Sequence, residues 1–210
     1  MDTFLSTVLA PAFTLWGSPA TWLELAAFFI ALAMVWCNLR VNPWAWPLAI
    51  TSSLMYALLF ADAKLYGEAG LQFVFIAVAL WGWWQWLRGT GADGAALRVR
   101  RLSVRARWLA LALTLAAWPL LGWVLSRATD SDVPYFDALP TVASITGQLL
   151  LGRKLLENWP TWLAVNIVSV ALFASKGLWL TVLLYALFAV LSVVGWRAWA
   201  RLAAPSATGR

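Results

Sequence analysis

Three carboxamide side chains stand out because each lies inside a long apolar stretch: Gln72, Gln148 and Asn166. A carboxamide can both donate and accept hydrogen bonds without carrying a charge. The chain has no histidine and a single cysteine, Cys37, which excludes the usual zinc sites, haem ligation by histidine, disulfides and Ser-His-Asp or Cys-His triads. The available chemistry is therefore hydrogen bonding to an uncharged polar group, and we expect no metal and no cofactor.

Hydroxyl and aromatic side chains extend this set, since helical spacing of three or four residues gathers several of them onto shared helix faces. Polar side chains within a membrane span usually face the bundle interior or a water-filled cavity. We therefore predict a substrate-binding set drawn from the following residues: Gln72, Asn166, Gln148, Tyr56, Ser53, Tyr185, Trp162, Trp46, Trp159, Thr181 and Trp36.

Plainer explanations stand beside this prediction. A polar side chain within a span can simply join two helices by a hydrogen bond worth about 0.6–2 kcal/mol. Many of the 17 tryptophans lie near the ends of apolar stretches, where a belt at the membrane interface explains them without any ligand. Trp36, Trp46, Trp81, Trp159 and Trp162 are better placed to stack on a planar cationic ring, and nothing in the sequence selects one of the five.

The composition requires a membrane. Of the 210 residues, 63% are hydrophobic and only 11% are charged, whereas a soluble domain is about 25% charged. The net charge of +6 fits arginines on the cytoplasmic side of a membrane rather than a nucleic-acid partner. The chain is therefore expected to be an all-α integral membrane protein whose surroundings are the lipid bilayer.

Seven stretches approach the length of about 20 apolar residues that a transmembrane helix needs. They are Leu25–Leu39, Trp46–Ala61, Ala69–Leu87, Trp108–Leu125, Ala138–Gly152, Trp159–Ser175 and Gly177–Gly195. The segment Phe4–Trp16 is short and interrupted by Pro11, so we expect an interfacial helix or a loose lead-in there.

The loops between these stretches set the orientation. With seven spans and the C-terminus inside, twelve of the fifteen basic residues lie in cytoplasmic segments, and seven of the nine acids lie on the other side. The positive-inside rule therefore predicts a multi-pass protein of the bacterial cytoplasmic membrane with its N-terminus out and its C-terminus in.

An internal repeat organises the chain. An offset of 113 residues aligns Trp22–Arg88 with Tyr135–Arg201 without a gap, matching a Trp-Pro pair (Trp46 and Trp159) and a Gly-Trp-x-x-Trp motif (Gly82 and Gly195). Each repeat holds three spans, and the fourth span between them gives both the same orientation. The prediction is a 3+1+3 fold of two parallel repeats and a linker helix, as in SWEET transporters.

The expected segments follow from this repeat. They are an N-terminal interfacial segment (1–21), a first three-helix repeat (22–88), a basic cytoplasmic loop (89–107), a linker helix (108–126), a second three-helix repeat with its leading outer loop (127–201) and a C-terminal tail (202–210). Parallel repeats are a transporter design with the substrate site at the repeat interface, although duplicated bundles can also serve packing alone.

Several aromatic motifs resemble those of the Pnu-type vitamin transporters, most of all the PnuC nicotinamide riboside branch. They are Asn42-Pro-Trp-Ala-Trp-Pro, Tyr66-Gly-Glu-Ala-Gly-Leu-Gln72, Trp81-Gly-Trp-Trp-Gln-Trp86, Glu157-Asn-Trp-Pro-Thr-Trp162 and Gly195-Trp-Arg-Ala-Trp199. The resemblance covers Trp22 to Arg201. It implies facilitated diffusion of a nucleoside-like vitamin, trapping by a cytoplasmic kinase, and a homotrimer. Relatives that carry thiamine or riboflavin keep those substrates open.

Two other function classes are disfavoured. Ion-coupled transport usually leaves an Asp, Glu or Arg in mid-span, and the nearest here is Glu68 at a span end. A membrane-embedded enzyme, the remote alternative, needs convergent acid–base or metal groups, which this composition does not supply. We therefore expect no catalytic residues.

Overall fold

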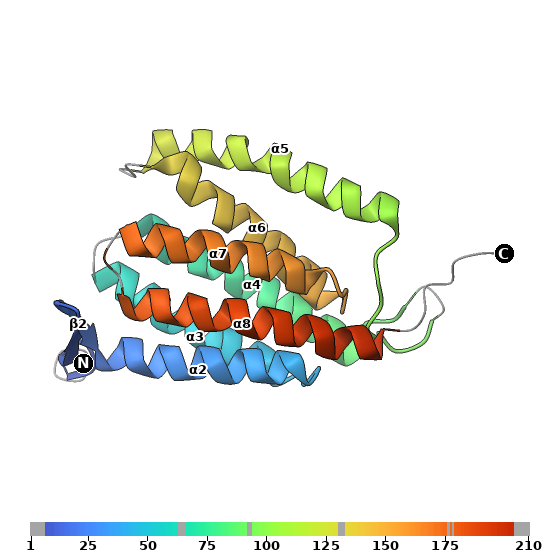
Figure 1. Cartoon of the computed structure of the whole chain (residues 1–210), viewed down its shortest axis with the longest axis horizontal. Helices are drawn as coiled ribbons and strands as arrows, with labels where there is room; N and C mark the ends of the chain where they lie inside the picture. The colour runs from blue at the N-terminus through green and yellow to red at the C-terminus, as the bar shows by residue number, and fades with distance from the viewer. Residues whose placement is uncertain are drawn as a thin grey trace.

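The computed structural model describes residues 7–62, 66–91, 94–129, 133–175, 177 and 179–203, and these form seven long helices (Figure 1). Each predicted apolar stretch lies in one helix, except that Gly177 belongs to the turn before the last helix. The helices are α2 (Trp22–Leu39), α3 (Ala45–Asp62), α4 (Tyr66–Arg88), α5 (Val104–Ala128), α6 (Pro134–Gly152), α7 (Asn158–Ser175) and α8 (Trp179–Leu202).

Four of these helices are long and apolar enough to cross a membrane within the part of the chain that the structure describes. They are α2, the Ala69–Arg88 part of α4, α5 and α8, and a shorter apolar run covers Ala45–Leu59 of α3. Polar side chains such as Gln148 in α6 and Asn166 in α7 lower the hydropathy of those two helices. The count of seven spans therefore stays a prediction.

The N-terminal segment differs from its expected form. Strands β1 (Pro11–Leu15) and β2 (Ser18–Thr21) form an antiparallel hairpin in place of an interfacial helix or loose lead-in. Trp16 and Gly17 connect them with φ values of 46° and 87°, the left-handed pair that a tight two-residue hairpin turn requires. Pro11 and Pro19 lack the backbone N–H groups that a helix interior needs. Residues 1–6 lie outside the described residues.

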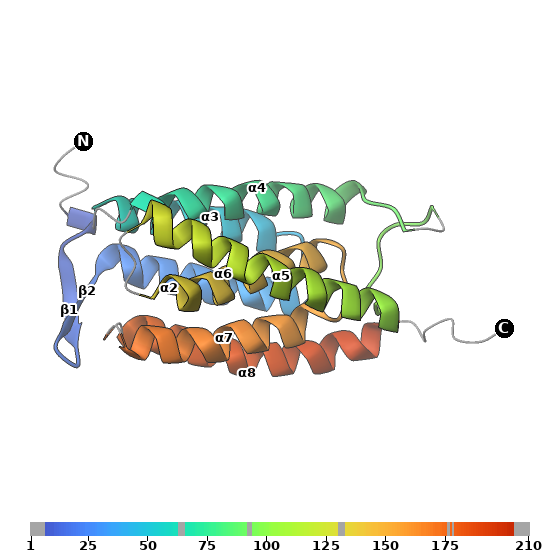
Figure 2. The same cartoon turned by 90° about the horizontal axis from the view of Figure 1, so that it is seen from above.

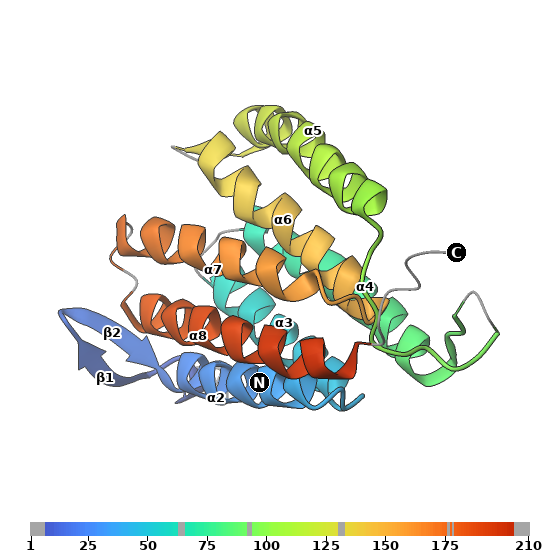
Figure 3. The same cartoon turned by 45° about the vertical axis from the view of Figure 1, so that its right-hand side comes forward.

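Six helices close into a ring (Figure 3). Around it α2 packs against α3, α3 against α4, α4 against α6, α6 against α7, α7 against α8, and α8 back against α2. Helix α5 lies outside this ring over α6 (Figures 1 and 2). Thr114 and Thr146 share a 2.8 Å hydrogen bond there, and the Trp118 indole donates to the Tyr135 carbonyl at 2.6 Å.

The two ends of the bundle differ in charge. One end, the hairpin end, carries the β-hairpin and the starts of α2, α4, α6 and α8. The opposite end, the arginine end, holds all the described basic residues except Arg127: Arg40, Arg88, Arg98, Arg100, Arg101, Arg105, Arg107, Arg153, Lys154, Arg197 and Arg201. This segregation gives each end a distinct electrostatic character.

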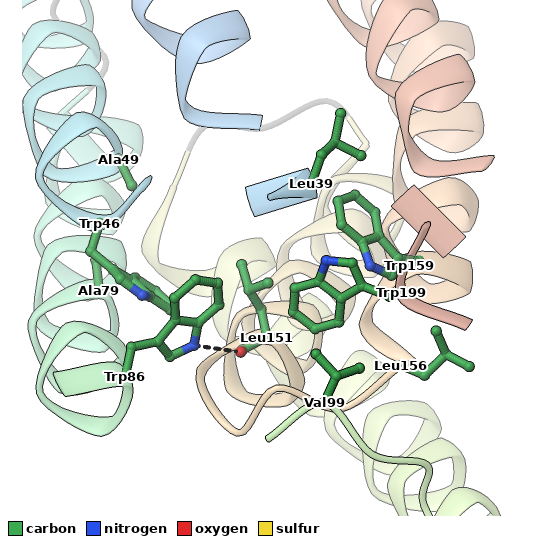
Figure 4. Packing of buried hydrophobic residues seen from close by; sticks show 10 residues of the cluster. All are labelled: Leu39, Trp46, Ala49, Ala79, Trp86, Val99, Leu151, Leu156, Trp159 and Trp199. Atoms are coloured by element: carbon green, nitrogen blue, oxygen red, sulfur yellow. Dashed lines mark hydrogen bonds between the residues drawn. The ribbon is translucent and has the colours of Figure 1, made fainter. Parts of the chain in front are cut away.

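A cluster of four tryptophans forms the core at the arginine end (Figure 4). Trp46 meets Trp86 edge to face at 5.5 Å, and Trp159 meets Trp199 in the same way at 5.6 Å. The Trp86 indole donates to the Leu151 carbonyl at 3.0 Å (Figure 4). In the same way, Trp199 donates to the Asn38 carbonyl at 3.0 Å. Both hydrogen bonds therefore join helices that are distant in the sequence.

Two glycines make this core possible. A Cβ atom added at Gly82 would overlap the six-membered ring of Trp46, and one added at Gly195 would overlap that of Trp159. The two contacts hold α3 close to α4 and α7 close to α8. Small residues at helix interfaces allow this close approach in membranes.

Residues 94–103, in the connection between α4 and α5, form a strap at the arginine end. Arg100 pairs with the α6–α7 turn, donating to the Lys154 carbonyl at 3.1 Å and accepting from Leu156 N–H at 2.9 Å. Glu157 accepts from Leu102 N–H at 3.0 Å and forms an ion pair with Arg107 at 2.9 Å. Helix α5 begins at Val104, four residues before the expected Trp108, because the Ser103 hydroxyl accepts from Ala106 N–H and caps it.

Lys154, in the α6–α7 turn, adds a further contact to the strap. Its ammonium donates to the Leu97 carbonyl at 3.0 Å and lies 5.1 Å from the centre of a Trp86 ring. Burial lowers the pKa of this group below its ordinary value. The strap is thereby attached both to the turn after α6 and to the last turn of α4.

The glycine contacts give a direct test of this packing. We expect Gly82→Ala and Gly195→Ala each to destabilise the protein by about 1–3 kcal/mol or more, since the added methyl group displaces a buried indole. Thermal unfolding of the purified protein in detergent measures the effect.

Gly70→Ala is the matched control in the same helix as Gly82, because the added Cβ would meet no described atom within 4 Å beyond its chain neighbours and the backbone of its own helix. It should leave the stability unchanged or raise it by up to about 1 kcal/mol. Equal melting temperatures for all three variants would contradict the packing described.

Candidate functional site

The predicted binding residues lie at three levels of the bundle. Gln72, Tyr56, Thr181 and Tyr185 lie in the half near the hairpin end, and Ser53 and Asn166 lie near the middle of α3 and α7. The remaining five lie toward the arginine end: Trp36, Trp46, Gln148, Trp159 and Trp162. The structure therefore spreads the set along the bundle and brings only part of it together.

Tyr56 and Thr181 come together in a pocket near the hairpin end. The pocket is a partly open hollow between α2, α3 and α8, and its lining is Glu24, Phe28, Tyr56, Leu180, Thr181 and Leu184. A second partly open hollow adjoins it beneath the β-hairpin, because Glu24, Leu180 and Thr181 line both. Two predicted residues thus share one cavity, which lies where α2 meets α8.

The other two residues of this half lie in different surroundings. Tyr185 packs its ring against Phe173 at 5.1 Å and Phe188 at 5.8 Å. Gln72 is half-buried in α4. Its carboxamide makes no hydrogen bond to another described residue, so its donors and acceptor remain available.

Asn166 already has a partner near the middle of the bundle. Only 2% of the residue is exposed. Its amide donates to the Ser192 hydroxyl at 3.2 Å, and Ser192 donates to the Phe188 carbonyl at 2.7 Å. The structure therefore shows the helix-joining role for Asn166, while Ser53 is half-buried in α3.

The aromatic candidates near the arginine end mostly serve packing here. Trp46 and Trp159 are 1% and 3% exposed and lie against the glycines described above, and their indole N–H groups meet no acceptor among the described residues. Trp162 packs over Gly147 of α6. Trp36 is 54% exposed, with the Arg40 guanidinium 4.7 Å from its ring centre. Gln148 is half-buried in α6.

The sequence analysis missed four residues of the pocket: Glu24, Phe28, Leu180 and Leu184. Glu24 and Phe28 are four residues apart and so share one face of α2. That spacing was visible in the sequence. The contact of this face with α8 was not, because the two helices are far apart along the chain.

Comparisons with known proteins agree on one family. The model of the family described as "Nicotinamide mononucleotide transporter" matches residues 21–201. The riboflavin/roseoflavin transporter RibM of Streptomyces davaonensis is 31% identical over 90% of this chain and 89% of its own. The nicotinamide riboside transporter PnuC of Escherichia coli is 27% identical over 69% of this chain and 71% of its own.

A solved structure agrees with the fold. The crystal structure of the vitamin B3 transporter PnuC matches with a TM-score of 0.73 and 24% identity, covering 86% of this chain and 81% of that one. These relatives are named as transporters, not as enzymes. With a family match across almost the whole bundle, the chain belongs to the nicotinamide mononucleotide transporter family and is a multi-pass membrane transporter rather than an enzyme.

Proposed function

We propose that the protein carries a vitamin across the bacterial cytoplasmic membrane by facilitated diffusion, with nicotinamide riboside the foremost substrate and a cytoplasmic kinase trapping it. The observation that carries this proposal is the seam between α2 and α8, where a pocket is lined from helices of both repeats. Transporters built from parallel repeats bind their substrates at the repeat interface near the membrane midplane, and this pocket lies on that interface toward the hairpin end.

The structure supports two equivalent three-helix units. The hydrogen bond from Trp86 to Leu151 and the one from Trp199 to Asn38 involve positions that differ by the repeat offset of 113. The turns after α2 and α6 are equivalent too, since Val41 and Lys154 have φ values of 54° and 52°. We infer a 3+1+3 fold in which α2–α4 and α6–α8 are parallel repeats and α5 links them.

The substrate has two close alternatives. The relative with 31% identity is named as a riboflavin transporter, and a relative with 27% identity is named as a nicotinamide riboside transporter. Thiamine is a third candidate from the resemblance of the aromatic motifs. We place nicotinamide riboside first because those motifs most resemble its transporters, and we retain the homotrimer as part of the proposal.

Passive transport is the expected mechanism. The charged residues of the described helices lie within six residues of a helix end, and an ion-coupled carrier usually has one in mid-span. In proteoliposomes, labelled nicotinamide riboside should exchange against unlabelled vitamin without a proton or sodium gradient. Accumulation of the unmodified vitamin that collapses with an ionophore would contradict facilitated diffusion.

Gln72 and Asn166 are proposed to bind the uncharged polar part of the vitamin from opposite repeats. Removing either carboxamide leaves a polar group of the bound ligand unpaired. This costs about 1–3 kcal/mol of binding free energy and lowers the affinity roughly ten- to a hundredfold. We expect Gln72→Ala and Asn166→Ala to weaken binding by such factors in calorimetry.

Ser192→Ala separates the two roles of Asn166. It removes the interhelical partner and keeps the carboxamide, so it should lower thermal stability while binding changes by less than in Asn166→Ala. If the wild type and both carboxamide variants bind the vitamin equally well, these residues serve helix packing and the binding site lies elsewhere.

The proposed orientation places the arginine end in the cytoplasm and the N-terminus outside. In a Cys37→Ser background, Arg98→Cys should resist an impermeant thiol reagent in intact cells, because Arg98 is exposed at the arginine end. Ser131→Cys should react; this position lies outside the described residues, between α5 and α6. The reverse labelling pattern would overturn the topology.

A further inference from the structure

The pocket near the hairpin end contains one carboxylate and two aromatic rings. Glu24 supplies the carboxylate, Phe28 and Tyr56 supply the rings, and Thr181 adds a hydroxyl. None of the described residues that line this pocket or the adjoining hollow is a lysine or arginine. Among the described residues, the lining therefore combines a carboxylate with two aromatic rings and contains no lysine or arginine.

The position of the Glu24 carboxylate is fixed by the start of α2. One of its oxygens, Oε2, accepts from Thr21 N–H at 2.8 Å, and the Thr21 hydroxyl accepts from Glu24 N–H at 3.1 Å. This reciprocal pair is a capping box. A carboxylate has acceptor capacity beyond one hydrogen bond, and the helix N-terminus stabilises its negative charge.

The surroundings of this carboxylate suit a flat cation. Aromatic rings attract a cation that approaches their faces, and a carboxylate beside them adds a direct charge interaction. A pyridinium or thiazolium ring has this charge and shape, whereas the isoalloxazine ring of riboflavin is neutral at pH 7. The pocket also lies on the repeat seam at the proposed outer end, where a substrate arrives.

We propose that Glu24 makes this pocket an entry subsite for cationic vitamins and so favours nicotinamide riboside over riboflavin. This inference rests on the proposed transport function and narrows its substrate class. The plainer role of Glu24 is capping alone. The two roles separate because glutamine also completes a capping box but carries no charge.

The test compares wild type, Glu24→Gln and Asp137→Asn, with nicotinamide riboside and riboflavin as probes. Asp137 is the residue that the repeat offset pairs with Glu24; it lies in the first turn of α6 and does not line the pocket. Both substitutions remove one negative charge at the same end of the bundle. Calorimetry measures the dissociation constants, with the protein concentration taken as that of the folded protein. Counterflow in proteoliposomes measures exchange.

We expect Glu24→Gln to weaken binding of nicotinamide riboside about two- to fivefold, the scale of a partly exposed ion pair. The affinity for riboflavin should stay unchanged. Asp137→Asn should bind both probes as the wild type does. Glu24→Asp, which keeps the charge, should retain most of the affinity for nicotinamide riboside and so separate charge from local disruption of the fold.

Three results would overturn the inference while leaving transport intact. They are unchanged nicotinamide riboside affinity in Glu24→Gln, an equal loss in Asp137→Asn, and a wild type that exchanges riboflavin but not nicotinamide riboside. A wild type that exchanges no vitamin at all would overturn the proposed function together with this subsite.

Discussion

The two three-helix halves of the bundle, α2–α4 and α6–α8, are joined at the arginine end by indole N–H groups that donate to backbone carbonyls. Each hydrogen bond depends on a series of contacts. Gly82 leaves room for the Trp46 ring, and Trp46 packs edge to face against Trp86. Trp86 then donates to the Leu151 carbonyl. The equivalent chain of the second half ends at Asn38. Because lipid is as apolar as the side chains, close packing and hydrogen bonds must hold helices together, and here both act at the same four tryptophans.

The halves are equivalent in this core and unequal around it. The strap binds the turn after α6, through Leu156 N–H and the Glu157 carboxylate. The corresponding positions after α2 are Pro43, which has no N–H, and Trp44, which has no carboxylate. No equivalent strap can therefore form on the first half. Since α5 also packs on α6, we expect α5 to move with the second half if the halves rock against each other.

The sequence was sufficient for the features that depend on local pattern. Apolar stretches located all seven described helices, and the paired Trp-Pro and Gly-Trp-x-x-Trp motifs marked residues that meet in the core. Apolar content did not reveal the hairpin, which depends on left-handed backbone at Trp16 and Gly17. The sequence did not predict the strap or the place of Glu24 in the pocket lining, because each depends on a contact between segments far apart in the chain.

The two carboxamides proposed to bind the vitamin, Gln72 and Asn166, differ in their hydrogen bonding before a ligand arrives. Asn166 already donates to Ser192, so a ligand that takes this N–H exchanges one hydrogen bond for another and gains little free energy from it. Gln72 makes no hydrogen bond to another described residue, so the same ligand contact there breaks no such bond. A carrier must release what it binds on the opposite side. One exchanged contact and one new contact allow recognition from both repeats without the tight binding that would slow release.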